Sequence, residues 1–558
     1  MSKQRNSKKH RKTNSKQTRT PKYIFVVGGV MSGLGKGIAT SSLSLLLQQR
    51  GYTVTTIKID PYVNVDAGTM NPVEHGEVFV LDSGLECDQD MGNYERFLNT
   101  SLPAINYMTT GMVYQTVINK ERQLEYGGDC VQVVPDIPNE VIRRIRQAQK
   151  ESKADITLVE VGGTVGEYEN LLYLEAARMM RLEAPDDVLF TLVSYLPVPK
   201  MVGEMKTKPT QHASRTLNGA GLQADLLVGR SEQPLDDVRK KKLATLCNIR
   251  SDRVVSAPDS ESVYDVPLVF EEDNLSEKVL KSFNMSAPAA DLKDWKRYVT
   301  QSKNTKQTVR IGIVGKYFYS GDYVMADSYI SVIEAIKHAW ASYNVEPQIE
   351  WLNSEAFEEE DAALMDLQMY DGIIVPGGFG SRGIEGKLQA IRIIREQKIP
   401  YLGLCYGMQL AVIEFARNIV GISEAHTTEV NPNTAEPVID VMPDQDQLVK
   451  NQNLGGTMRL GAYNCDIASR TLTRRLYQRS QVSERHRHRY EVNNEYRDQL
   501  EEAGLSFPGT NPELGLIEIT EIPNHPFFIG TQFHPEFLSR SLRPHPLFKG
   551  LVRAAMNR

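Results

Sequence analysis

The segment Tyr23-Ile-Phe-Val-Val-Gly-Gly-Val-Met-Ser-Gly-Leu-Gly-Lys-Gly-Ile38 decides the fold of the N-terminal half. An apolar β-rich run ends in glycines, and residues 38–49 then follow the pattern of a helix. Backbone N–H groups of such a loop, the helix N-terminus and a lysine together favour phosphate binding. The loop departs from the usual pattern, because its first glycine lies one residue too far from Gly35-Lys36 and Gly37 replaces Ser or Thr. We interpret it as a nucleotide-binding loop rather than a tight turn with a surface lysine.

Further apolar runs continue the pattern at residues 53–59, 155–161, 188–195 and 225–228. Continuous apolar strands separated by helices indicate a parallel sheet covered on both faces. A more polar stretch then predicts a linker with one helix near residues 292–300, and a second α/β pattern begins at Val309, with strands at 371–375 and 401–404. The chain is therefore predicted to be α/β with two parallel-sheet domains. We expect a basic disordered tail (1–21), a P-loop-like domain (22–285), a linker (286–308) and a C-terminal domain (309–558).

Composition excludes several classes of protein. Of the 558 residues, 41% are hydrophobic and 24% are charged, which is ordinary for a soluble globular protein. No run of about 18 apolar residues predicts a membrane span, and residues 2–20 lack the apolar stretch of a signal peptide. The five scattered cysteines resemble neither a disulfide framework nor a zinc site, which indicates a reducing compartment and a cytoplasmic location.

Charge is unevenly distributed along the chain. Residues 1–22 contain nine Lys or Arg and no acidic residue, although the whole chain has a net charge of −6. We expect a solvated, disordered tail. An RNA-contacting arm is a less favoured alternative. A mitochondrial presequence is disfavoured because the tail has no apolar face.

Two short segments of the C-terminal half predict attack on an amide. In Gly403-Leu-Cys-Tyr-Gly407, a cysteine follows an apolar strand and precedes a helical stretch over 408–417, which is the spacing of a nucleophile elbow. His534-Pro-Glu536 supplies a base, His534, and a carboxylate, Glu536, that can orient it. The N–H of Tyr406 and the loop Gly377-Gly-Phe-Gly380 can stabilise an oxyanion. We therefore interpret Cys405 as a nucleophile rather than a buried structural thiol.

Three other charged segments are open to more than one interpretation. Asp90 and Glu160 are candidate magnesium ligands, and Glu160 ends a predicted strand, where open α/β sheets bind ligands. Residues 206–211 and Lys242 are either a solvated basic face or a site for a second phosphate-bearing ligand, with Pro209 favouring an extended loop. In Arg485-His-Arg-His-Arg489, the guanidinium groups oppose a metal ion and favour an anion or carboxylate.

With both sites on one chain, the sequence resembles the CTP synthase family, whose C-terminal domain is a class I glutamine amidotransferase domain and whose N-terminal domain is a synthetase (amidoligase) domain. The resemblance covers about residues 22–555. It is carried by residues 28–37, 58–62, 71–78, 160–166, 206–211, 376–380, 454–461, 485–494 and 532–536.

The resemblance implies a role for each residue that matches a family motif. ATP is held by Gly33, Leu34, Gly35, Lys36, Gly37, Ile38 and Asp90, with Pro258, Asp259 and Ser260 near adenine. Lys58 supports phosphoryl transfer, and Asp90 and Glu160 bind Mg²⁺. UTP or CTP is held by Ser32, Glu167, Tyr168, Glu169, Lys206, Thr207, Lys208, Pro209, Thr210, Gln211 and Lys242. Glutamine is held by Gly378, Tyr406, Gly407, Met408, Gln409, Glu429 and Arg489. His75 and Val78 line an ammonia path, and Arg459 is a lid residue.

The implied activity is amination of UTP to CTP, with ATP as co-substrate and ammonia from glutamine. CTP inhibition, GTP activation, a homotetramer and filaments are implied as well, without contact to a membrane. Three residues depart from the family: Glu167-Tyr-Glu169 replaces Asp-Ile-Glu, which could alter feedback, and Tyr406 replaces leucine. The alternatives are an amidotransferase acting on another substrate, and a partitioning-type ATPase or filament-forming scaffold.

Overall fold

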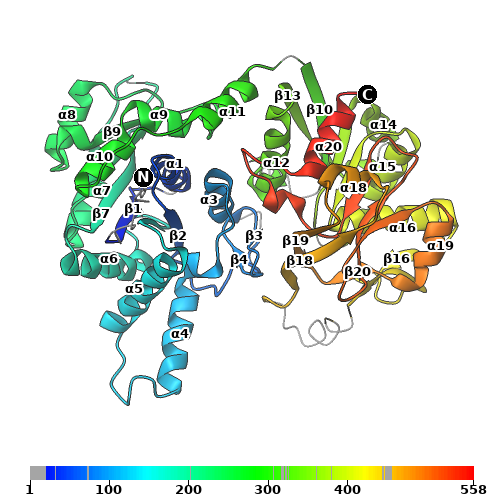
Figure 1. Cartoon of the computed structure of the whole chain (residues 1–558), viewed down its shortest axis with the longest axis horizontal. Helices are drawn as coiled ribbons and strands as arrows, with labels where there is room; N and C mark the ends of the chain where they lie inside the picture. The colour runs from blue at the N-terminus through cyan, green and yellow to red at the C-terminus, as the bar shows by residue number, and fades with distance from the viewer. Residues whose placement is uncertain are drawn as a thin grey trace, which may run out of the picture.

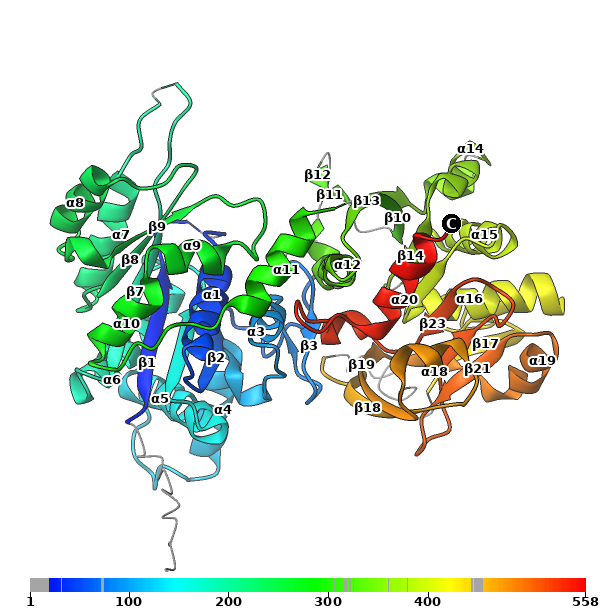
Figure 2. The same cartoon turned by 45° about the horizontal axis from the view of Figure 1, so that its top comes forward.

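The structure is a computed structural model that describes residues 20–442, 445 and 455–558, except residues 32, 72–74, 202, 306, 316–318, 321–322, 325, 360 and 379. Ser32 and nearly all of the predicted basic tail lie outside the described residues. The chain forms an N-terminal and a C-terminal half, each built around its own large sheet and joined through α11 (Lys293–Lys303) (Figures 1 and 2). No described helix is both long and apolar enough to cross a membrane.

The N-terminal sheet is parallel throughout, as predicted. Its strand order is β5-β2-β6-β1-β7-β8-β9, which places the first strand of the chain near the centre. The strands are β1 (Lys22–Gly28), β2 (Val54–Asp60), β5 (Tyr107–Thr109), β6 (Ile156–Val161), β7 (Val188–Tyr195), β8 (Leu226–Ser231) and β9 (Val254–Pro258).

Helices cover both faces of this sheet, because alternate residues of β1 enter different cores. Phe25 and Val27 pack into one core, and Ile24 and Val26 pack into the other. The first core is closed by α4 (Thr110–Arg122), α5 (Val133–Ser152), α6 (Leu171–Glu183) and α7 (Lys208–Gly219). The second is closed by α1 (Lys36–Gln49), α3 (Asp90–Leu98), α9 (Val266–Glu272), α10 (Leu275–Ser282) and α11.

The C-terminal sheet is mixed, which differs from the predicted parallel sheet. Its order is β13-β10-β14-β15-β23-β22-β21-β18-β19. The first five strands are parallel: β13 (Val345–Asn353), β10 (Gln307–Gly315), β14 (Gly372–Val375), β15 (Tyr401–Leu404) and β23 (Phe528–Thr531). The last four are antiparallel: β22 (Ile517–Glu521), β21 (Ser506–Thr510), β18 (Arg459–Ile467) and β19 (Gln481–His488). Burial alternates along much of β18, so this strand lacks the continuous apolar run on which the prediction relied.

The linker helix α11 and the helix after Cys405, α16 (Tyr406–Phe415), begin close to their predicted positions. Trp295 and Tyr298 of α11 are buried in the second N-terminal core, so the linker is packed rather than loose. The C-terminal half also contains α12 (Ile330–Ala341), α15 (Ile384–Glu396) and α20 (Pro546–Ala555). The small hairpin β3 (Phe79–Val80) and β4 (Glu86–Cys87) extends from the N-terminal half toward β18 and β19, as both views show.

Candidate active site

Cys405 lies on a strained turn between β15 and α16. Its backbone has φ 52° and ψ −102°, a conformation that costs energy for a residue with a side chain. A Cβ added to Gly407 would lie 2.1 Å from the carbonyl oxygen of Val375, and one added to Gly403 would lie 2.8 Å from the carbonyl carbon of Gly407. Both glycines are therefore required for the sharp turn, and the local backbone is the elbow that the spacing predicts.

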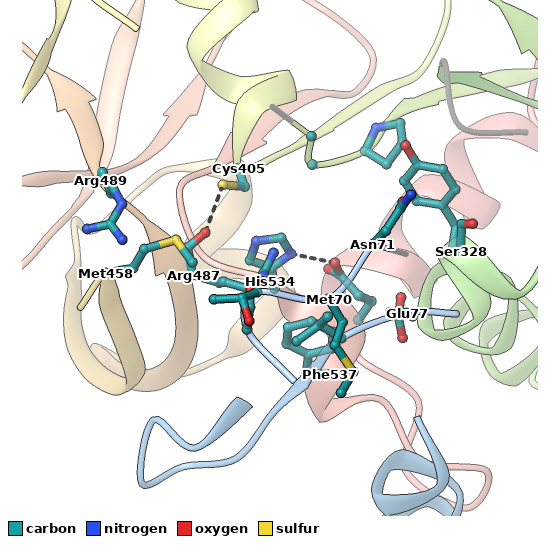
Figure 3. Close-up of a pocket in the computed structure, with 18 residues that line it drawn as sticks. Met70, Asn71, Glu77, Ser328, Cys405, Met458, Arg487, Arg489, His534 and Phe537 are labelled. Atoms are coloured by element: carbon teal, nitrogen blue, oxygen red, sulfur yellow. Dashed lines mark hydrogen bonds and ion pairs between the residues drawn. The ribbon is translucent and has the colours of Figure 1, made fainter. Parts of the chain in front are cut away.

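His534 and Glu536 follow β23 and meet Cys405 at the end of the parallel strands. Nδ1–H of His534 donates to Oε1 of Glu536 over 2.7 Å, and the backbone N–H of His534 donates to the Arg485 carbonyl at 2.8 Å. A Cβ on Gly377 would lie 2.9 Å from Cε1 of His534, so this position must be glycine for the ring to fit. The three predicted residues line one cavity (Figure 3).

The electrostatics of the site favour a protonated imidazole. Burial lowers the pKa of His534, but Glu536 and Cys405 outweigh it and raise this pKa to about 10. An imidazolium beside the cysteine stabilises the thiolate, which is the nucleophilic form. In the structure the Cys405 thiol donates to the Arg487 carbonyl at 3.8 Å, and Nε2 of Gln532 donates to the sulfur at 3.7 Å. The contacts of Gln532 and Arg487 with the sulfur could not be predicted from the sequence, because no spacing signal marks them.

The cavity at Cys405 is formed by both halves of the molecule. It has a volume of about 480 Å³. Its C-terminal walls include Gly378 and Arg489, two predicted glutamine-binding residues, while Val78 comes from the N-terminal half. The other lining residues are Gly68, Thr69, Met70, Asn71, Glu77, Ser328, Tyr329, Pro376, Gly377, Met458, Arg487 and Phe537. A group released at the cysteine therefore enters a space that already borders the other half.

The remaining predicted glutamine residues lie around or beneath this cavity. The backbone N–H of Gly380 donates to Glu429 at 3.0 Å, and the hydroxyl of Tyr406 donates to the Gly380 carbonyl at 3.4 Å. Met408 and Gln409 are buried under the elbow, where Gln409 donates to the Tyr490 carbonyl at 2.8 Å. Met408 and Gln409 thus support the elbow from below.

Two arginines of the basic cluster over 485–489 bind carboxylates, but those of the protein itself. Alternate side chains of β19 point to opposite sides. Arg487 donates to Glu86 at 2.7 Å, and Arg485 donates to Glu95 of α3 at 2.9 Å. Between them, His486 lies within the C-terminal half, with Nδ1 2.9 Å from Nε2 of His488.

Arg459 is not placed as the predicted lid residue. It begins β18, is 4% exposed and donates to Glu491 at 3.0 Å and to Glu518 at 2.7 Å. Two buried carboxylates fix its guanidinium in place, so the side chain cannot move as a lid without leaving both of them unpaired.

The glycine loop places two lysines beside a group of carboxylates. Gly33 and Gly35 have φ values of 70° and 77°, which favour glycine. Lys36 donates to the Gly163 carbonyl at 2.6 Å, and burial lowers the pKa of Lys36. Nζ of Lys58 lies 2.5 Å from Asp90 and 3.1 Å from Glu160, with Asp60 at 3.7 Å and Asp88 at 4.0 Å. One cation thus faces four carboxyl groups.

The unusual Gly37 is explained by Asp90. A Cβ at position 37 would lie 2.1 Å from Oδ1 of Asp90. The carboxylate of α3 therefore occupies the space in which a usual phosphate loop places its Ser or Thr side chain. Compared with a usual phosphate loop, this loop lacks the Ser or Thr hydroxyl oxygen. A carboxylate oxygen of Asp90, from α3, lies in its place.

The residues at this site fit a magnesium ion. Asp90 and Glu160 both contact Lys58, and Asp60 and Asp88 lie within 4.0 Å of the same ammonium group. Burial raises the pKa of Glu160, which a divalent cation would reverse. No three His, Cys, Asp or Glu side chains of the described residues form a complete metal site. Mg²⁺ needs no such cage, because it uses one or two carboxylates together with water and phosphate oxygens.

The predicted adenine residues line a cavity next to the glycine loop. It has a volume of about 300 Å³ and is lined by Gly35, Ile38, Pro258, Asp259 and Ser260. Arg230 also lines it and pairs with Asp259 at 3.0 Å. Arg230 could not be predicted from the sequence as a residue of this cavity, because an arginine at the end of a strand carries no distinguishing pattern.

The predicted UTP residues are distributed over several elements. The expected extended loop at 206–209 is wrong, because α7 begins at Lys208, with Pro209 in its first turn, where proline needs no N–H partner. Thr210 is buried and donates to the Tyr195 carbonyl at 3.2 Å. Lys242 is exposed on α8 (Asp237–Leu246), and Tyr168 is 87% exposed in the 3₁₀ turn η2 (Tyr168–Asn170).

Each half of the chain matches a known protein family. The model of the CTP synthase N-terminus matches residues 22–285, and the model of class-I glutamine amidotransferases matches residues 324–554. The CTP synthase of Pyrococcus furiosus is 52% identical over 96% of this chain and 98% of that protein. The CTP synthase of Halalkalibacterium halodurans is 47% identical over 97% and 100%. A solved structure, the glutaminase domain of Trypanosoma brucei CTPS with bound acivicin, is 37% identical, covers 45% of this chain and 94% of that chain, and has a TM-score of 0.41. The chain belongs to the CTP synthase family.

Proposed function

We propose that this chain aminates UTP to CTP, using ATP and ammonia taken from glutamine. As a member of its family it is a glutamine-hydrolysing carbon–nitrogen ligase. The observation that carries the proposal is the cavity at Cys405, because walls from the N-terminal half close the space into which ammonia would be released. We assign the amination to residues 22–285 and the glutaminase to residues 309–558.

In the glutaminase reaction, the Cys405 thiolate attacks the side-chain amide carbon of glutamine. A rotation of the thiol away from the Arg487 carbonyl brings it toward Nε2 of His534, which takes the thiol proton and leaves the thiolate that attacks. The N–H of Tyr406 stabilises the oxyanion. His534 gives its proton to the leaving nitrogen, so ammonia departs neutral, and then activates the water that releases glutamate. Glu536 holds the ring and its charge throughout. Gly378, Glu429 and Arg489 hold glutamine.

In the N-terminal half, transfer of the ATP γ-phosphoryl group to O4 of UTP turns a poor leaving group into a good one. Lys36 and Lys58 orient and neutralise the phosphate oxygens. Asp90 and Glu160 would hold Mg²⁺, which supplies further neutralisation of phosphate charge. Pro258, Asp259 and Ser260 hold adenine, while residues 206–211, Lys242 and Glu167-Tyr-Glu169 hold the pyrimidine nucleotide.

Transfer inside the protein keeps the ammonia reactive, since ammonium in water is not nucleophilic. His75 and Val78 line the route, with Val78 at the cavity wall. The proposal also includes regulation and location: the chain is inhibited by CTP, activated by GTP, forms a homotetramer and is located in the cytoplasm. Tyr168 is exposed and replaces the isoleucine of the family motif. Its larger side chain can change how tightly CTP binds.

The test supplies the chain with ATP, UTP, Mg²⁺ and either glutamine or ammonium chloride, and measures CTP, ADP and glutamate. We expect CTP from both nitrogen sources and no CTP from other nucleotides. ATP hydrolysis that needs no UTP, with no CTP formed, would instead support the scaffold ATPase.

A further inference from the structure

Glu77 connects the two halves at the wall of the glutaminase cavity. It belongs to the N-terminal half, precedes β3 and lines the cavity (Figure 3), near enough to Glu536 for that carboxylate to raise its pKa. The backbone N–H of Ser331 lies 3.2 Å and 3.1 Å from its two carboxylate oxygens, and the Ser331 hydroxyl donates to it as well. Ser331 is in the first turn of α12, so a residue of one half caps a helix of the other.

This contact is one end of a polar stripe along α12. Ser331, Glu334 and His338 are spaced i, i+3 and i+7, which places them on one face of the helix. At the far end, the hydroxyl of Tyr264 donates to Glu334 at 2.5 Å and lies 2.6 Å from Nε2 of His338. At the near end, Nη1 of Arg96 donates to the Ser331 hydroxyl at 3.3 Å. The N-terminal half therefore holds α12 at two separate places.

The near end lies next to the cavity wall. Ser328 and Tyr329, which line the cavity, directly precede α12. From the other half, Asn71 and Val78 line the same cavity on either side of Glu77 in sequence. Loss of the cap would remove the contacts of Glu77 with Ser331 that join these two wall segments, and Arg96 would keep its contact with the Ser331 hydroxyl.

We propose that Glu77 is a positioning residue for ammonia transfer: by capping α12 across the domain interface, it keeps the cavity wall closed, so that ammonia released at Cys405 reaches the N-terminal half instead of solvent. The inference rests on the proposed function, because it concerns the step between the two reactions. Burial raises the pKa of Glu77 to about 8, although the hydrogen bonds from Ser331 lower it, so the carboxyl is mostly neutral at pH 7. A glutamine side chain reproduces this neutral acceptor.

The experiment measures CTP and glutamate formed in the same reaction, and separately the CTP formed from ammonium chloride. For Glu77→Ala, which removes the acceptor of both the Ser331 N–H and its hydroxyl, we expect glutamate production and ammonium-driven CTP synthesis to persist, while the CTP-to-glutamate ratio falls by roughly threefold to tenfold or more. Glu77→Gln should keep a ratio near that of the unmodified chain. Ser331→Ala, which removes the hydroxyl from the other partner, should lower the ratio.

Tyr264→Phe is the matched control, because it weakens the same helix interface at the end away from the cavity. It should leave the ratio unchanged. The proposal is overturned if Glu77→Ala keeps the normal ratio, if Tyr264→Phe lowers the ratio equally, or if both Glu77→Ala and Ser331→Ala lose ammonium-driven synthesis. Failure of the unmodified chain to make CTP from ammonium would instead refute the proposed function, independently of every variant.

Discussion

Glu95 of α3 and Arg485 of β19 form an ion pair across the two halves in which neither side chain is exposed. Arg485 donates to both carboxylate oxygens, at 2.9 Å and 3.0 Å, and Arg540 donates to Glu95 at 2.6 Å. The carbonyl of Arg485 accepts the backbone N–H of His534 at 2.8 Å. His534, the proposed general base, is thus one backbone hydrogen bond away from the domain interface.

Replacing Glu95 by Ala leaves two buried guanidinium groups without their shared carboxylate. Breaking a buried pair in this way costs about 3–5 kcal/mol, so we expect a clear fall in the free energy of unfolding. Chemical denaturation of the full chain measures it. Glu183→Ala, which removes a partly exposed ion pair with Arg146, is the control and should leave the midpoint unchanged. Equal midpoints for Glu95→Ala and the unmodified chain would contradict the structural role.

Replacing Cys405 by Ala separates the two reactions. Glutamine-dependent CTP formation should fall by about a thousandfold or more, because no other group supplies the nucleophile. CTP formation from ammonium chloride should remain. Cys465→Ala is a comparison, since that cysteine is also buried but lies on β18. If Cys405→Ala lost ammonium-driven synthesis to the same extent, the division of labour between the halves would be wrong.

Local features of the fold could be predicted from sequence, whereas contacts between halves could not. Residues 23–27 and 38–49 lie within β1 and α1 because apolar runs and glycines act locally. The β18–β19 pair was missed because its side chains alternate between a core and an interface. Glu77 and Ser331 are 254 positions apart, and neither carries a signal that it meets the other. The position of Asp90 beside Gly37 likewise depends on how α3 packs against the glycine loop, which the spacing of residues in the sequence does not reveal.

Replacing Glu536 by Gln removes the main group that keeps His534 protonated. The pKa of His534 should fall from about 10 toward 6.5, and alkylation of Cys405 by iodoacetamide at pH 7 should slow. Because the folded pKa lies above the unfolded value, protonation of His534 stabilises the fold below pH 6.5, and this contribution is lost as the pH rises to about 10.

The difference in unfolding free energy between the unmodified chain and Glu536→Gln should therefore be largest near pH 6.5 and shrink toward pH 10. Denaturation at several pH values measures this trend. A difference that grows with pH would show that the imidazole is neutral in the folded protein.

Replacing Gly37 by Ser restores the residue that most phosphate loops have, yet we expect it to impair this enzyme. The new Cβ would lie 2.1 Å from Oδ1 of Asp90, so either α3 or the loop must move. Displacing a group that orients phosphates by about 1 Å costs roughly a hundredfold in rate. Ammonium-driven CTP synthesis should fall by about that factor, while the glutaminase keeps its rate. Gly219→Ala, at a glycine with nothing within 4 Å of its added Cβ, is the matched control and should have no effect. Full synthetic activity in Gly37→Ser would mean that Asp90 does not occupy the place of the missing side chain during catalysis.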